Sequence, residues 1–274
     1  MNRLPKEKRV QIVSALVEGN SLRSTSRMCD VSINTVTKLL VDLGAACQDY
    51  QDENLRGLTT KRVQVDEIWS FVGAKAKNVP EERQGEFGIG DVWTWTAIDA
   101  DTKLVPCWHV GRRNAEDAAE FISDLASRLT NRVQLTSDGH KPYLQAVEDA
   151  FGSEIDYAVL VKLYGSDPMA ARRYSPPICT GTEKDVINGH PDPSHISTSY
   201  VERQNLTMRM SMRRFTRLTN AFSKKVENHM AAISLHFMHY NFCRIHKTLR
   251  CTPAMEAGIS DHVWSIEELV GLLG

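Results

Sequence analysis

The order of strand-like and helix-like patterns between residues 63 and 163 constrains the fold of this chain most strongly. Strands are predicted where β-branched and aromatic residues alternate with polar ones, and helices where apolar residues recur at helical spacing. The order is three strands, a helix, a strand, a helix and a strand, over 63–71, 92–98, 104–110, 114–129, 133–136, 142–151 and 157–163. A meander followed by strand–helix crossovers predicts an α/β fold, in which helices flank a mixed sheet.

The residues before this sheet predict a small all-α domain over 1–44. Three short helical patterns, the last closed by Gly44, follow the layout of a helix-turn-helix. On the third helix Asn34, Thr35 and Lys38 face outward, where such domains contact DNA bases and phosphates. A plain three-helix bundle with a polar face is the alternative. Polar residues 45–62 are predicted to be a linker.

Residues 164–199 interrupt the regular pattern. Five of the ten prolines lie there, which predicts a long irregular insert in a catalytic domain that spans 63–250. Beyond the insert, helical patterns run over 198–218 and 223–246. Residues 251–274 are predicted to form a C-terminal tail.

Charge is distributed unevenly along the chain, although the net charge is only −1. Residues 63–160 contain nine bases and seventeen acids, whereas residues 203–250 contain ten bases and one acid. An acidic block followed by a basic block favours a carboxylate-rich site next to a surface that binds a polyanion. No apolar run approaches the ~18 residues of a membrane span, and a signal-peptide core is missing. We therefore expect a cytoplasmic, nucleoid-associated protein with no membrane partner.

The basic block predicts contacts to DNA phosphates. The strongest candidates are Arg213, Arg214 and Arg217, and His246 is the histidine expected nearest to an active site. A stripe of histidines in the same block could instead hold zinc. One straight helix rarely offers more than two ligands to a tetrahedral ion, so packing is the favoured interpretation of that stripe.

Three carboxylates stand out by position. Asp66 lies in the first predicted strand, Asp138 ends the fourth, and Glu202 lies near the start of the helix after the insert. Carboxylates that share a site repel one another unless cations screen them. Mg²⁺ and Mn²⁺ prefer oxygen ligands, and two such ions ~3.5–4 Å apart can drive an in-line phosphoryl displacement. Acids at strand edges and on helices are also common surface residues, so the trio is a hypothesis.

Neighbouring strand residues face opposite sides of a sheet, which predicts that only one of Asp66 and Glu67 joins this site. We choose Asp66. Glu202, Asn205 and Arg209 recur at i, i+3 and i+7, on one stripe of the later helix. Glu202 would bind metal, Asn205 would contact a phosphate or hold the glutamate, and Arg209 would contact DNA.

Four segments carry a resemblance to a known family. They are VDEIWSF at 65–71, TSDGH at 136–140, TSYVERQNLTMR at 198–209, and YNFCRIHKTL at 240–249 followed by TPA at 252–254. In these segments, and over roughly residues 8–260, the sequence resembles bacterial insertion-sequence DDE transposases, most closely the insertion-sequence-one type. A basic residue seven positions after the glutamate, here Arg209, is also a family feature. The Cys-rich zinc-binding module that members often carry has no counterpart in this sequence.

The resemblance implies an RNase H-like domain in which Asp66, Asp138 and Glu202 hold two Mg²⁺ or Mn²⁺ ions. It implies metal-dependent cleavage of DNA strands at insertion-sequence ends and their transfer to target DNA. The implied partners are double-stranded DNA, as terminal inverted repeats and target, and further copies of the chain in a homo-oligomer. Two alternatives stay open: a catalytically inactive DNA-binding regulator derived from a transposase, and an RNase H-like nuclease without joining activity.

Overall fold

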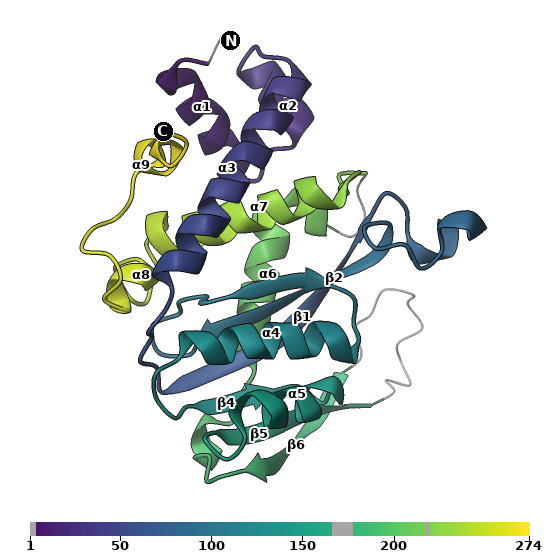
Figure 1. Ribbon diagram of the computed structural model, residues 1–274, viewed down its shortest axis with the longest axis vertical. Helices are drawn as coiled ribbons and strands as arrows, with labels where there is room; N and C mark the ends of the chain where they lie inside the picture. Colours follow the sequence, from purple (N-terminus) through teal and green to yellow (C-terminus); the bar gives the residue numbers. More distant parts are fainter. Residues whose placement is uncertain (1–3, 166–177, 217–219) are drawn as a thin grey trace.

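The computed structural model describes residues 4–165, 178–216 and 220–274. In this part of the chain, a six-stranded sheet has the order β3-β2-β1-β4-β5-β6 (Figure 1). Its strands are β1 (Arg62–Val72), β2 (Gly90–Asp99), β3 (Trp108–Gly111), β4 (Gln134–Ser137), β5 (Asp156–Gly165) and β6 (Ile178–Asn188). The α-helices are α1 (Lys6–Val17), α2 (Leu22–Met28), α3 (Ile33–Asn54), α4 (Ala115–Arg128), α5 (Pro142–Phe151), α6 (Ser199–Ser211), α7 (Val226–Met238), α8 (Pro253–Glu256) and α9 (Ile266–Gly271).

The strand directions make this a mixed sheet. β1 pairs with β2 antiparallel and with β4 parallel, and β4 pairs with β5 parallel. The outer pairs, β2 with β3 and β5 with β6, are antiparallel. The meander and the two strand–helix crossovers expected from the sequence are present. The expected α/β class, a mixed sheet flanked by helices and preceded by short N-terminal helices, is therefore confirmed.

Helices cover both faces of the sheet (Figure 1). Helices α4 and α5 pack on one face, in a core that includes Val65 of β1. Helices α6 and α7 pack on the other face, in a core that includes Ile68 of β1. Because successive side chains of a strand point to opposite faces, Asp66 shares the α6 and α7 face with Ile68, whereas Glu67 shares the α4 and α5 face.

Helix α3 is longer than expected. The sequence predicted a helix end at Gly44 and a linker over 45–62, but α3 continues to Asn54. A Cβ atom on Gly44 would lie 2.5 Å from the Cβ atom of Ala231 on α7. Glycine therefore permits a close crossing of two helices at this position and does not end the helix. Buried residues of α1, α3, α7 and the C-terminal tail form one hydrophobic cluster, so the N-terminal helices pack on the rest of the molecule.

A strand lies inside the segment that was expected to be irregular. β6 pairs antiparallel with β5, for example Val159 with Asp185, and extends the sheet at its edge. The residues of β6 predict a strand only weakly, and hydrogen bonds to β5 stabilise the strand. Residues 166–177, which include three of the five prolines of this segment, lie outside the described residues. α6 also ends earlier than expected, at Ser211.

In the described ranges, no helix combines the length and the apolar character that crossing a membrane requires.

Candidate metal centre

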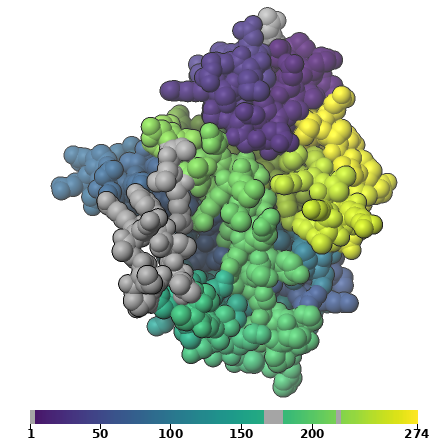
Figure 2. All heavy atoms as spheres, turned by 180° about the vertical axis from the view of Figure 1, so that it is seen from behind, coloured from purple at the N-terminus to yellow at the C-terminus, as the bar shows by residue number. Residues whose placement is uncertain are grey.

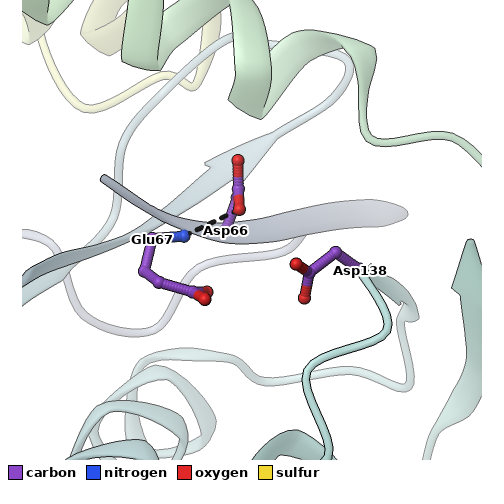
Figure 3. A group of neighbouring side chains, drawn as sticks. All are labelled: Asp66, Glu67 and Asp138. Carbon is purple, nitrogen blue, oxygen red and sulfur yellow. Dashed lines mark hydrogen bonds between the residues drawn. The ribbon is translucent and has the colours of Figure 1, made fainter. Parts of the chain in front are cut away.

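Three carboxylates from two adjacent strands meet at one place. Asp66 and Glu67 lie in β1, and Asp138 directly follows β4. One carboxylate oxygen from each of the three lies within 4.8 Å of the others. In Figure 3, Asp66 and Glu67 leave opposite sides of β1, and the carboxyl groups of Glu67 and Asp138 turn toward one another.

The sheet register explains this meeting. The parallel pairing of β1 with β4 places Gln64 beside Thr136. Two residues further along each strand come Asp66 and Asp138, so the two aspartates emerge next to each other. The chain turns sharply after β4, because one oxygen of Asp138 accepts a hydrogen bond from the backbone N–H of His140 at 3.0 Å.

Asp66 is held in place by two donors. The backbone N–H of Glu67 donates to Oδ1 at 2.9 Å, and Nδ2 of Asn205 donates to Oδ2 at 2.8 Å. Asn205 was expected to contact a phosphate or to hold Glu202. The structure instead directs this amide to Asp66, because Asn205 lies on the face of α6 that packs against β1. Its role as a DNA contact stays a prediction.

Glu67 was excluded by the alternation of strand side chains, and this exclusion was wrong for the position of its carboxylate. The side chain does leave β1 on the other face. However, it is long enough to bring its oxygens to the same place as those of Asp66 and Asp138. Its carboxylate is buried, with Nε of Arg113 donating to one oxygen at 2.5 Å and the hydroxyl of Tyr143 donating to the other at 3.1 Å. A signal for this arrangement existed in the adjacent acids of the VDEIWSF segment.

Glu202 reaches the same cavity from α6. Asp66, Asp138 and Glu202 all line a cavity of about 750 Å³. The carboxylate of Glu202 pairs with the ammonium group of Lys162 on β5 and accepts a hydrogen bond from the Thr198 hydroxyl at 2.5 Å. The structure thus brings the three sequence-predicted acids to one cavity. Glu202, however, pairs with Lys162 and does not belong to the cluster of Asp66, Glu67 and Asp138.

The electrostatics of the centre show excess negative charge. Burial, followed by the charges of Glu67, Asp138 and Glu202, raises the pKa of Asp66 from 3.8 to about 7. Burial and the charge of Asp138 also raise the pKa of Glu67, against the opposing effect of Arg113. Carboxylates gathered at a cation site repel one another in this way unless a cation compensates their charge.

The donor set suits a hard divalent cation. Carboxylate oxygens are the ligands that Mg²⁺ and Mn²⁺ prefer, and the cluster offers one from each of Asp66, Glu67 and Asp138 within a short span. A dication would relieve the mutual repulsion that raises the pKa of Asp66. Glu202 could serve as a further ligand once Lys162 moves from its carboxylate.

Apart from Asn205, the sequence-predicted DNA contacts that the structure describes do not line the acidic cavity. Asn34 and Lys38 are exposed near the start of α3, where Lys38 pairs with Asp42 at 2.6 Å. Thr35 lies beside them, and its backbone N–H donates to Ser32, which caps the helix. Arg209 and Arg214 are partly exposed, Arg213 is exposed, and Arg217 lies outside the described residues. His246 does not line the acidic cavity, and its Nδ1 atom is 3.1 Å from the Thr248 hydroxyl.

Comparisons with known proteins give weak likenesses. No protein-family model matches the sequence, and no curated protein matches it. A cryo-EM structure of the piggyBac transposase synaptic complex with hairpin DNA is 10% identical, covers 99% of this chain and 71% of that chain, and has a TM-score of 0.41. A crystal structure of a pre-cleavage Mos1 transpososome is 12% identical, covers 57% of this chain and 60% of that chain, and has a TM-score of 0.22. Neither likeness assigns an activity to this chain.

Proposed function

We propose that this chain is a DDE-type transposase that cleaves DNA strands at insertion-sequence ends and joins them to target DNA. The observation that carries the proposal is the convergence of Asp66 and Asp138 at the junction of β1 and β4, with Glu202 on the wall of the same cavity. The resemblance to bacterial insertion-sequence transposases rests on sequence segments that contain these three residues, and this supports the proposal.

The residues of the cavity would have three roles: metal binding, orientation of a metal ligand and binding of phosphate. Two Mg²⁺ or Mn²⁺ ions, held by Asp66, Asp138 and Glu202, would activate the attacking oxygen and stabilise the leaving oxygen of a phosphodiester. Asn205 orients the Asp66 carboxylate through its hydrogen bond. Lys162 and Lys141 line the same cavity and would bind the phosphate of a DNA strand, Lys162 after leaving the Glu202 carboxylate.

DNA is the proposed substrate because basic residues accompany the acidic centre. Asn34, Thr35 and Lys38 of α3 would contact duplex DNA, and Arg209 and Arg213 would bind phosphates. Joining two element ends requires that they be held together, so the proposal includes a homo-oligomer on DNA.

A cleavage and joining assay tests the proposal. Duplex DNA that carries the element ends is incubated with a target plasmid in Mg²⁺ or Mn²⁺. We expect nicked and joined products, and Asp138→Ala and Glu202→Gln should each lower product formation by at least about 100-fold, because metal ligands matter more than their supporting partners. Asp185→Ala, at an exposed position of β6 outside the cavity, is the matched control.

The outcomes separate the alternatives. Full joining by Asp138→Ala and Glu202→Gln would falsify the assigned site. DNA binding without any cleavage by the wild-type chain would favour the regulator, and cleavage without joined strands would favour a nuclease.

A further inference from the structure

A second cavity lies away from the acidic centre, between the N-terminal helices and residues 210–214 and 220–224. Its volume is about 1200 Å³. Figure 2 shows the N-terminal helices, in purple, above the green α6 and α7 part of the molecule. The two parts touch closely, because a Cβ atom on Gly19 would lie 2.8 Å from the backbone oxygen of Ser211.

The lining of this cavity is strongly basic. It includes one acid, Glu18, and five bases, which are Arg23, Arg27, Arg213, Arg214 and Lys224. We call this cavity the basic groove. A surface that is solvated and has no ligand normally mixes charges of both signs, so a five-to-one excess of bases favours a polyanionic ligand.

Arg214 is the unusual member of the groove. Its guanidinium group is partly buried, and Nη1 donates to the hydroxyl of Ser223 at 2.7 Å. In the described residues no carboxylate forms an ion pair with it, and burial lowers its pKa to about 10. Buried charges in proteins are normally paired, because an uncompensated charge out of water is costly. Arg214 is therefore a partly buried cation to which a negatively charged ligand could bind.

A chain of buried hydrogen bonds holds Arg214 in this position. The Ser70 hydroxyl donates to the carbonyl of Val92 at 3.1 Å, so we assign the proton of the His229 ring to Nε2, which lies 3.0 Å from that hydroxyl. Nδ1 of His229 then accepts from the Ser223 hydroxyl at 2.9 Å, and Ser223 accepts from Arg214. Each member donates to the next, which keeps His229 neutral, and burial lowers the pKa of this histidine to about 3.

The direction of this chain leaves Arg214 as a donor without a negatively charged acceptor among the described residues. Ser223 uses its only proton on His229, so it offers the guanidinium a lone pair but no compensating charge. The remaining guanidinium N–H groups can serve a ligand in the groove, and the planar fork of arginine matches the oxygens of a phosphate.

From the position of this guanidinium in the basic groove, we propose that the groove is a second DNA site, in which Arg214 binds a backbone phosphate. Arg213 and Lys224 contribute nearby positive charge. Ser223 and His229 are positioning residues that hold the guanidinium. The inference depends on the proposed function for the nature of its ligand, DNA, but not on cleavage at the acidic centre.

The test measures DNA binding without metal, so that cleavage plays no part. A labelled duplex of mixed sequence is titrated by fluorescence anisotropy at salt concentrations between about 50 and 200 mM. We expect Arg214→Met to weaken binding about 10-fold and to lower the slope of log K against log salt by about one unit. Lys61→Met, which removes an exposed base outside the groove, is the control.

A conservative variant keeps the test decisive if Arg214→Met does not fold. Arg214→Lys retains the charge but not the fork, so we expect weaker binding at an unchanged salt slope. An affinity of Arg214→Lys or Arg214→Met equal to that of Lys61→Met would overturn the proposal. Displacement of the duplex by polyglutamate as readily as by unlabelled DNA would overturn the choice of a nucleic acid as the ligand. Loss of cleavage with these binding results intact would count only against the proposed function.

Discussion

Replacing Asp66 by asparagine should stabilise the protein when metal is absent. In the folded chain the pKa of Asp66 is raised to about 7 by burial and by neighbouring carboxylates, against 3.8 for an ordinary aspartate. The folded state therefore binds more protons than the unfolded state between these two pH values. The stability of the wild-type protein should fall as the pH rises from about 4 to 7, and the full cost is present above that window.

The size of the effect follows from the shift. About three pKa units correspond to about 4 kcal/mol of lost stability at pH 8, as an upper figure. In the Asp66→Asn variant, the side-chain oxygen can accept the hydrogen bond from Asn205, but the NH₂ group cannot accept the one from the backbone N–H of Glu67. The loss of that hydrogen bond destabilises the variant by about 1 kcal/mol. We expect a net gain of about 2–3 kcal/mol, or about 5–10 °C in melting temperature for a chain of this size.

Thermal unfolding followed by circular dichroism measures this gain. Wild type and Asp66→Asn are melted with EDTA at pH 8 and at pH 5, where the gain should be smaller because wild-type Asp66 is already protonated. Addition of Mg²⁺ should raise the melting temperature of the wild type and leave that of the variant nearly unchanged. A variant that is less stable than the wild type at pH 8, or a gain that does not depend on pH, would refute the reasoning.

Two further substitutions test packing and charge. Gly44→Leu should destabilise the protein by at least about 1–3 kcal/mol, because α3 and α7 cross at Gly44 without room for a side chain. Chemical unfolding measures this loss, and an unchanged unfolding midpoint would contradict the close contact of the two helices. Arg113→Met should cost about 3 kcal/mol at pH 8, because it removes the cation that compensates the buried Glu67 carboxylate. That loss should shrink at acidic pH, where Glu67 takes up a proton. The control is Arg83→Met, which removes an exposed arginine from its ion pair with Glu86, and equal losses of Arg113→Met at both pH values would argue against a charge effect.

The secondary structure of the central sheet could be predicted because its signals are local. The helix expected over 114–129 appears as α4, and the Asn114 side chain caps it by accepting from the backbone N–H of Asp117 at 2.9 Å. The strands β1, β2, β4 and β5 appear where alternation placed them, since the pattern of a strand is carried by its own residues. Asp66, Asp138 and Glu202 were selected in the same way, from their positions at strands and a helix start, and the three line one cavity.

Other features depended on residues far apart in the chain. β6 forms by pairing with the edge strand β5, which comes from another part of the chain. α3 continues through Gly44, where the glycine leaves room for Ala231 of α7. The role of Glu67 depended on Arg113 and Tyr143, whose positions relative to β1 are set only when α4 and α5 pack on the sheet.

The sequence by itself thus determined the order of the strands and helices between residues 63 and 163, the separation of acidic from basic residues, and the three acids that line one cavity. Only the tertiary structure decided which carboxylates approach one another and that Lys162 pairs with Glu202. It also decided that Arg214 is partly buried without a counter-charge among the described residues. The physical reason is that periodicity acts over neighbouring residues, whereas burial and electrostatic pairing depend on side chains that the fold brings together from distant positions.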